Sequence, residues 1–397
     1  MSDVFLKRLN EDPEYFEFWQ DLREYCKDLN IPDKKEFVDT LPILYKRIEN
    51  DGAGYYIYEG LRSFAEKRPK EAIEILSMLE ERGARETLVF TPSILSGLSK
   101  AKIEYSFEAK VLEYLESDND DLVFSGIDAA YRVNFKSQEK ELEFLNDVHN
   151  LFQKIIKQKS TKHIGIIVRF YNKHLNTIKG AKEIIIELLK EKIPSVQGEV
   201  ARSLNEEFKP EEDLEYFKKS LNLLSLTEPK FNGVYNTIRY RLKDVIVSHP
   251  EIIAEFIENW VLNNNQKLKG IIVLEGIIVE LYLKHPKVIQ SLFLEWLNSD
   301  NDLYKASLQF IISNLSSKVD AVGLHKESLK ELSETDSQYV VYMIVGYILD
   351  RKYASEMLYN ILEINYNNVK IRNLIAALFV NCTSSNELGL SRSKVKS

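Results

Sequence analysis

Apolar residues recur at helical spacing along the chain, and the pattern is clearest between residues 249 and 315. From Pro250, and again from Pro286, 36 residues later, large apolar residues recur three or four positions apart, as they do on one face of an α-helix. A proline suits the first turn of a helix, where backbone N–H groups lack helical partners. A polar turn and a second apolar run follow each time. The pattern predicts two successive helical hairpins.

A repeat at longer range extends this prediction to most of the chain. The segment LEYLESDND over Leu112–Asp120 returns as LEWLNSDND over Leu294–Asp302, 182 residues later. That offset is close to five steps of roughly 36 residues, the length of one two-helix repeat. We therefore predict an all-α fold of about eleven helical hairpins. The turn signals lie near Asp51, Gly83, Ser117 to Asp120, Ser160, Pro194, Glu228-Pro229, Asn263 to Asn265, Ser299 to Asp302, Thr335-Asp336 and Asn365 to Asn368.

Within each hairpin, a polar turn precedes the second helix. Asp, Asn and Ser suit this turn because their side chains accept hydrogen bonds from the free N–H groups that open a helix. The second helix of the clearest hairpin, expected over Leu268–Leu281, is apolar around nearly its whole circumference, which predicts burial on several sides. The other expected pairs are 108–116 with 122–132, 140–157 with 164–175, 182–192 with 196–205, 214–224 with 234–247, 328–332 with 339–349, and 354–362 with 369–379.

The two ends of the chain depart from the pattern. The first hundred residues are richer in aromatic residues and fit the period less well. An array of repeats needs an end face that tolerates water, so we expect residues 1–50 to form an atypical helical cap and residues 51–383 to form the array. Residues 384–397 are rich in Ser and Lys without apolar periodicity. We expect this tail to be disordered.

Hairpins of this length, with Asp or Asn at the internal turn and apolar second helices, resemble HEAT or armadillo-type repeats over about Glu36 to Cys382. The resemblance implies an α-solenoid, a right-handed superhelix whose second helices line a concave surface. It implies no particular ligand. The usual tetratricopeptide signature, with Trp, Leu-Gly and Tyr at fixed places, is not reproduced in the sequence.

Composition narrows the class of function. The formal net charge of −8 and the pI near 5.6 disfavour a dedicated nucleic-acid binder, which needs a surplus of Lys and Arg, although one basic groove on an acidic body stays open. The two cysteines, Cys26 and Cys382, lie near opposite ends, which indicates free thiols in a reducing compartment. The sequence contains no signal peptide and no apolar run long enough for a bilayer. We therefore expect a cytoplasmic protein.

The histidines do not form a metal-ligand set. His249 and His285 recur one period apart, each before a helix-opening proline, and repetition at that period indicates a structural role at the turn between repeats. His163 and His174 are eleven residues apart on one expected helix, about 16 Å by helical rise and too far to share a metal ion. His149 and His325 stand alone. We expect no metal and no cofactor.

Three other motifs are better explained by helix structure. The acidic turns at Asp118–Asp121 and Asp300–Asp302 lack the later ligands of a calcium loop, and helix capping explains them. The glycine-rich stretch Asn50–Gly54 lacks the Gly-Lys-Ser/Thr of a phosphate loop, so we interpret it as a turn between helices. Trp260, Trp296 and Tyr114 fall at equivalent repeat positions and are expected in the core.

One basic strip is the candidate binding surface. Polar residues recur on the expected second helices, away from their apolar stripe, and stacking would bring them onto neighbouring rungs. Glu199, Glu206, Glu275 and Glu280 interrupt the strip, and a merely solvated face is the alternative. An acidic protein segment or a nucleic-acid backbone would suit it, with Tyr235 and Tyr240 nearby. The strip comprises Arg169, Lys173, Arg202, Asn236, Arg239, Lys243 and Lys305.

Two functions follow from these observations. The first is a scaffold or adaptor without catalytic activity, whose concave face binds a partner protein or peptide. The second, less favoured, is nucleic-acid binding, either as a subunit of a nucleic-acid-processing complex or in the manner of the HEAT-like DNA glycosylases. Those enzymes use an Arg, a Trp and an Asp at the lesion; Arg239 and Arg169 could serve here, but Trp260 and Trp296 are expected in the core. The oligomeric state is open.

Overall fold

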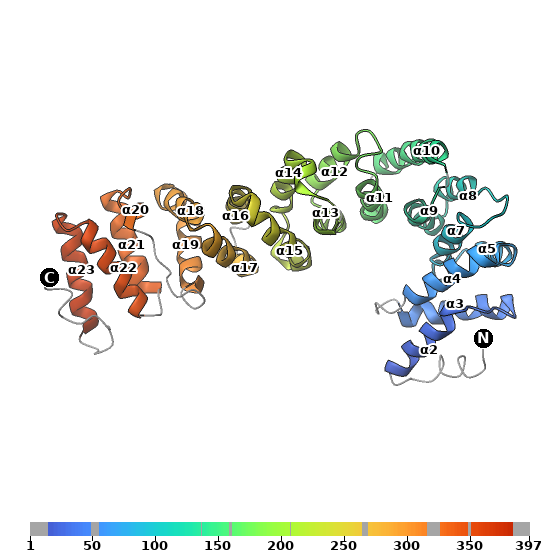
Figure 1. Ribbon diagram of the computed structural model, residues 1–397, viewed down its shortest axis with the longest axis horizontal. Coiled ribbons are helices and arrows are strands. Elements are labelled where there is room, and N and C mark those ends of the chain that lie inside the picture. The colour runs from blue at the N-terminus through green and yellow to red at the C-terminus, as the bar shows by residue number, and fades with distance from the viewer. Residues whose placement is uncertain are drawn as a thin grey trace. The chain divides into compact units, whose positions relative to one another are not determined.

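The computed structural model describes residues 15–48, 55–135, 137–158, 161–206, 208–263, 269–315, 326–347 and 351–383. Every regular element in these ranges is a helix (Figure 1), so the prediction of an all-α fold is confirmed there. The chain divides into two compact units, Met1–Ile185 and Ile186–Ser397, and the division falls within α12 (Ala181–Lys190). In both units, helices pack mostly with near neighbours in the chain.

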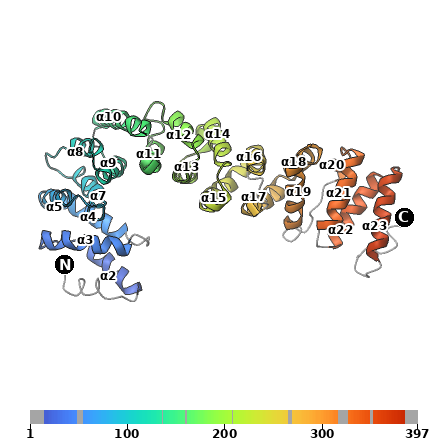
Figure 2. The same cartoon turned by 180° about the vertical axis from the view of Figure 1, so that it is seen from behind.

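The first unit contains two rows of helices. In its first row, each helix packs against the next, as the views from both sides show (Figures 1 and 2). The first row comprises α2 (Tyr15–Lys27), α4 (Tyr55–Lys67), α7 (Thr91–Leu98), α9 (Asp120–Arg132) and α11 (Thr161–Lys173). The second row comprises α3 (Lys34–Ile48), α5 (Pro69–Arg82), α8 (Phe107–Leu115) and α10 (Gln138–Lys157). In this second row α3 packs on α5 and α8 on α10, and the short α6 (Arg85–Leu88) contacts α3, α5 and α9.

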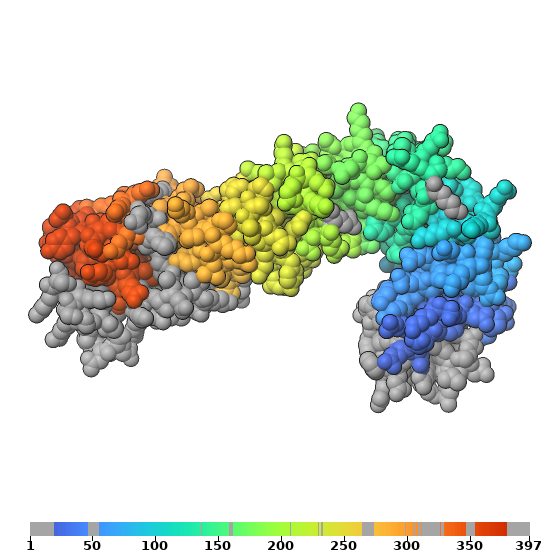
Figure 3. All heavy atoms as spheres, in the orientation of Figure 1, coloured from blue at the N-terminus to red at the C-terminus, as the bar shows by residue number. Residues whose placement is uncertain are grey.

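The second unit repeats this arrangement of two rows. Its first row comprises α13 (Pro194–Glu206), α15 (Asn232–Ser248), α17 (Lys269–Lys284), α19 (Asp302–Leu315), α21 (Glu334–Tyr347) and α23 (Val369–Thr383). Its second row comprises α14 (Leu214–Leu224), α16 (Pro250–Asn263), α18 (Pro286–Asn298), α20 (Lys326–Leu329) and α22 (Arg351–Ile364). Consecutive members of each row are in contact. In the space-filling view, side chains fill the spaces between the ribbons of neighbouring helices (Figure 3).

The clearest predicted hairpins are confirmed in detail. Helices begin at Pro250 and Pro286, as predicted. The preceding His249 and His285 share one backbone conformation, with φ −139° and −135° and ψ 62° at both. The apolar helix predicted near Leu268–Leu281 is α17, and it contacts α15, α16, α18 and α19. It is therefore buried on several sides, as its circumference of apolar residues predicts.

The duplicated segments have duplicated roles. Asn119 caps α9 by accepting a hydrogen bond from the Asp121 N–H at 2.9 Å, and Asn301 accepts one from the Leu303 N–H at 3.0 Å. The aromatic residues at equivalent positions of the two segments, Tyr114 and Trp296, are 1% and 0% exposed. Trp260, one repeat earlier, is equally buried. Capping and core packing therefore explain these motifs, as the sequence predicts.

Side-chain hydrogen bonds tie each repeat to the next. Ser96 donates to the Arg132 carbonyl, and Asn119 donates to the Gly83 carbonyl, both across 36 residues. In the second unit, Asn259 donates to Asn222 across 37 residues and the Trp296 indole donates to Glu258 across 38. These separations match the period in the sequence, so the repeat is a repeat of contacts as well as of residue types.

Some predicted boundaries are wrong by a few residues. Helix α21 begins at Glu334, so Thr335-Asp336 lies in its first turn; Ser333 precedes the helix and its hydroxyl accepts from the Asp336 N–H at 3.1 Å. Helix α11 ends at Lys173, so His174 follows the helix instead of lying on it. The turn Asn50–Gly54, the boundary at 50/51, His325 and the tail 384–397 lie outside the described residues.

No helix in the described ranges combines the length and the apolar character that crossing a membrane requires.

Candidate binding groove of the first unit

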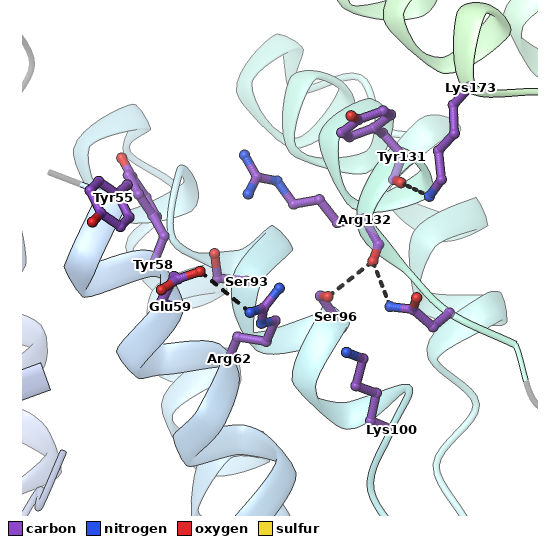
Figure 4. Close-up of a pocket in the computed structure, with 11 residues that line it drawn as sticks. Tyr55, Tyr58, Glu59, Arg62, Ser93, Ser96, Lys100, Tyr131, Arg132 and Lys173 are labelled. Atoms are coloured by element: carbon purple, nitrogen blue, oxygen red, sulfur yellow. Dashed lines mark hydrogen bonds and ion pairs between the residues drawn. The ribbon is translucent and has the colours of Figure 1, made fainter. Parts of the chain in front are cut away.

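A groove with a volume of about 590 Å³ opens along the first row of the first unit (Figure 4). Its walls come from α4, α7, α9 and α11 and from the residues that follow α7 and α9. The volume is in the range of sites that hold small ligands or parts of larger ones. The lining residues are Tyr55, Tyr58, Glu59, Arg62, Ser93, Ser96, Lys100, Tyr131, Arg132, Asn134 and Lys173.

Close packing of α7 on α4 positions one side of the groove. A Cβ atom at Gly97 would lie 2.2 Å from the Arg62 carbonyl oxygen and 2.7 Å from the Ala65 Cβ. Only glycine permits this approach of two helix backbones. Ser96, the neighbour of Gly97 in α7, is thereby held beside the helix that carries Arg62 (Figure 4). The small residues of α7 thus determine where the groove's charged side chains lie.

Hydrogen bonds fix the segment that follows α9. The Arg132 carbonyl accepts from the Ser96 hydroxyl at 3.0 Å and from the Asn134 amide at 3.1 Å. The Asn134 backbone N–H donates to the Ser99 hydroxyl at 3.2 Å. The backbone from Arg132 to Asn134 is therefore held against α7 (Figure 4). The side chains of Arg132 and Asn134 line the groove from this fixed position.

The groove is cationic although the chain is acidic. Among the described residues that line it, four are basic, namely Arg62, Lys100, Arg132 and Lys173, and Glu59 is the one carboxylate. The Arg62 guanidinium lies 3.5 Å from Glu59. Both side chains are well exposed, so this pair holds Arg62 only weakly.

The two cations at the far side of the groove are fixed by their neighbours. Arg132 donates through Nε to the buried Asp128 at 2.7 Å, which leaves its two Nη groups pointing away from that contact. Lys173 donates to the Tyr131 carbonyl, and its ammonium lies 5.0 Å from the centre of the Tyr131 ring (Figure 4). A cation that a hydrogen bond or an aromatic ring already holds in place can bind a ligand without a large further loss of side-chain freedom.

Tyrosines alternate with the cations. The Tyr131 ring has the Lys173 ammonium on it and the Arg169 guanidinium at 5.9 Å. Tyr58 stacks on Phe90 with 5.3 Å between ring centres, and burial raises the pKa of its hydroxyl to about 12. Tyr58 therefore stays a neutral hydrogen-bonding group, while Tyr55 is 50% exposed at the edge of the groove.

A second hollow continues the groove toward α2. It has a volume of about 390 Å³ and shares Tyr55, Glu59 and Arg62 with the first. Arg23 and Lys27 of α2 add two more basic side chains to its lining. The shared residues lie on α4, so Glu59 stands where one hollow meets the other. A chain lying in the larger hollow can extend into the smaller one.

Two members of the predicted strip lie at this groove. Lys173 lines it, and Arg169, one turn earlier on α11, lies against the ring of Tyr131. The strip and the groove thus share one face of α11. Its other five members belong to the second unit, and one continuous strip stays a prediction.

In the second unit, two cations of the strip have acidic neighbours. Arg202 on α13 forms an ion pair with Glu199 one turn earlier. On α15, Lys243 lies 3.1 Å from Glu280 of α17, and Arg239 contacts the exposed ring of Tyr240. Asn236 is exposed on the same helix. The side chain of Lys305, on α19, lies outside the part of the structure that is described.

The sequence contains a signal for the groove residues that the strip omits. Arg62 and Arg132 are 70 residues apart, and Lys100 and Lys173 are 73 apart, close to two steps of the roughly 36-residue period. Small residues in α7 weaken its apolar stripe, so periodicity does not predict this helix. A search for basic residues at twice the period would have found both pairs.

The remaining candidate chemistry lies outside the larger hollow, and of these residues Cys26 lines the smaller one. Among the described residues, no three His, Cys, Asp or Glu side chains are placed to hold a metal ion. His163 is 2% exposed, and its Nε2 lies 3.7 Å from Asp120. Cys26 is a buried free thiol, and burial raises its pKa to about 12. These buried groups serve packing in the first unit.

Comparison with models of known protein families and with curated proteins finds no match to the chain.

Proposed function

We propose that this chain is a binding protein without catalytic activity, which holds an acidic segment of a partner protein in the groove of its first unit. The observation that carries the proposal is the convergence of four cations from different helices on one cavity of an acidic chain. Burying or crowding like charges costs free energy unless a partner of opposite charge compensates them. A bound acidic segment supplies that compensation.

The wider architecture belongs to the same proposal. Two rows of helices in each unit, with side-chain bonds at the period of about 36 residues, support a HEAT-like α-solenoid of right-handed twist. Stacked repeats present extended surfaces, which suits the recognition of a chain segment more than the enclosure of a small substrate. The protein acts in this proposal as a scaffold or adaptor.

The test is affinity capture followed by mass spectrometry. The wild-type chain is compared with the double variant Arg62→Glu/Lys100→Glu, whose two positions line the groove and are exposed. The matched control is Arg85→Glu/Lys102→Glu, at two exposed positions outside the lining, which changes the net charge equally. We expect a protein captured by the wild type and the control and lost from the groove variant. Equal capture by all three chains would refute the groove as the partner site.

A second candidate ligand is a nucleic acid, and the tyrosines favour it. Aromatic rings between cations are how proteins hold single strands, with bases stacked on the rings and phosphates on the cations. The same capture experiment distinguishes the two, since nucleic acid would be recovered with wild type, lost from the groove variant and released steeply by salt.

A further inference from the structure

The larger hollow has the donors of a site for a single group of high charge. Four basic side chains from four successive parts of the first row surround one cavity, together with the hydroxyl of Ser93. A carboxylate carries one charge and is satisfied by one or two cations. A phosphate monoester carries close to two charges at neutral pH and presents three acceptor oxygens. The donors around the cavity therefore suit the charge and the three acceptor oxygens of a phosphate monoester better than those of a carboxylate.

The arginine at the far side is oriented for such a group. The Nε–H of Arg132 donates to Asp128, so the two Nη groups of the guanidinium are directed away from Asp128. Asp128 itself is 8% exposed and lies beneath the groove, which fixes the guanidinium plane. Paired N–H groups of arginine bind phosphate oxygens two at a time, whereas lysine acts as a point charge. Lys100, exposed and without an ion pair among the described residues, supplies that point charge.

Glu59 favours a peptide with one phosphate over a continuous nucleic-acid backbone as the ligand. It lines both hollows, at the residues that they share. A nucleic-acid strand that ran through both hollows would carry its regularly spaced phosphates past this carboxylate. A peptide with one phosphate places its charge in the larger hollow and passes Glu59 with an uncharged residue. Arg23 and Lys27 in the smaller hollow then favour an acidic side chain farther along the peptide.

From these observations, which rest on the proposed function, we infer that the groove recognises a phosphorylated segment of the partner protein. The phosphate lies among Arg62, Lys100 and Arg132, and an acidic residue on one side of it lies near Arg23 and Lys27. Phosphorylation of the partner would thereby control whether the scaffold binds it.

The test uses three oriented libraries of nine-residue peptides, with phosphoserine, glutamate or serine fixed at the centre and all other positions varied. The full chain is immobilised, and retained peptides are quantified by mass spectrometry. We expect retention of the phosphoserine library to exceed that of the glutamate library by about tenfold, because the second charge and third oxygen find donors. Among the retained peptides, Asp and Glu should be enriched on one side of the centre.

Variants show whether the preference comes from the groove. Lys100→Ala should lower retention of the phosphoserine library about fivefold, whereas Lys102→Ala, at an exposed position outside the lining, should leave it unchanged. Arg132→Lys keeps the charge but loses the fork, so it should reduce the preference for phosphoserine over glutamate. Thermal unfolding of each variant checks that the fold is retained.

The outcomes separate this inference from the proposed function. Equal retention of the phosphoserine and glutamate libraries, sensitive to Lys100→Ala, would overturn phosphate recognition and leave the acidic-segment function standing. If no library is retained while partner capture still depends on the groove, phosphate recognition is likewise overturned. Tighter binding of a single-stranded oligonucleotide than of any peptide would overturn both.

Discussion

Single residues at the ends of helices set the geometry of both units. Asn119 caps α9 with its side-chain oxygen and binds the Gly83 carbonyl with its amide. Gly83 has φ of +62°, which ends α5 in the left-handed conformation that glycine adopts without strain. One side chain thus closes the start of one helix and fixes the end of another, 36 residues earlier.

Substitutions of Asn119 separate these two roles. Asn119→Ala removes both hydrogen bonds and should lower the free energy of unfolding by about 1–2 kcal/mol. Asn119→Asp keeps the capping oxygen and loses only the bond to Gly83, so it should cost less. Chemical denaturation of both variants measures the difference. If both cost the same, the bond to Gly83 rather than the cap would carry the effect.

His174 should make stability depend on pH. Burial, together with the Lys173 charge, lowers its pKa from 6.5 to about 4, so the unfolded chain binds a proton that the folded chain rejects. Between about pH 6.5 and pH 4 the free energy of unfolding should therefore fall as pH falls, by up to about 3 kcal/mol from this residue. His149 and His163, whose pKa values are also lowered mainly by burial, act in the same direction.

The measurement is denaturant unfolding at pH 7 and pH 5, for the wild type and for His174→Gln. The variant lacks the titrating group, so its loss of stability between the two pH values should be smaller. An unchanged pH dependence in His174→Gln would show that His174 does not contribute to it.

At the scale of whole helices, the glycines of the two units have different surroundings. Gly97 lies where α7 packs on α4, and Gly126 of α9 lies where a Cβ atom would be 2.9 Å from the Tyr114 Cβ of α8. A Cβ atom at Gly198 of α13, in the second unit, would meet nothing within 4 Å. Among the described glycines, those that permit a close approach of two helices therefore lie in the unit that holds the groove.

Alanine substitution should act in opposite directions at these glycines. Gly97→Ala forces α7 away from α4 and should lower the free energy of unfolding by about 1–3 kcal/mol. Gly198→Ala, with open space around it, should raise it by about 0.4–1 kcal/mol because the unfolded chain loses freedom. Thermal unfolding compares the two. A neutral Gly97→Ala would mean that the helices can separate without cost, and the groove would then have no fixed shape.

How much of this the sequence predicts depends on the element. Helices with a wide apolar stripe and a Pro or Asn at the start, such as α16, α18 and α9, are predicted nearly to the residue. Helix α7 is missed because Ser93, Ser96 and Gly97 break its stripe, although all three are buried. Periodicity also identifies which face of α15 is polar. It does not show that Lys243 of that face meets Glu280 of the next helix.

At the scale of the molecule, stability is divided between two units that each have their own core. In the proposed repeat array, stability is close to a sum of repeats and their nearest-neighbour contacts. A local defect should therefore stay local.

Hydrogen exchange of Gly97→Ala tests this division. Exchange should accelerate in the neighbouring helices α4, α7 and α9, because the contact that is lost lies among them. Exchange in α15 and α17 should be unchanged. Hydrogen exchange is measured by peptide-resolved mass spectrometry at one pH and temperature. Uniform acceleration along the chain would show that the two units unfold as one.

The side-chain bonds across one repeat have a consequence for synthesis of the chain. Because Ser96 bonds to Arg132, and Asn222 to Asn259, a repeat can complete its contacts once the following hairpin has been translated. The entropy of loop closure is then set by one repeat length and not by 397 residues. The chain can thus fold hairpin by hairpin as it leaves the ribosome, so that only the apolar face of the most recently made hairpin is exposed to solvent.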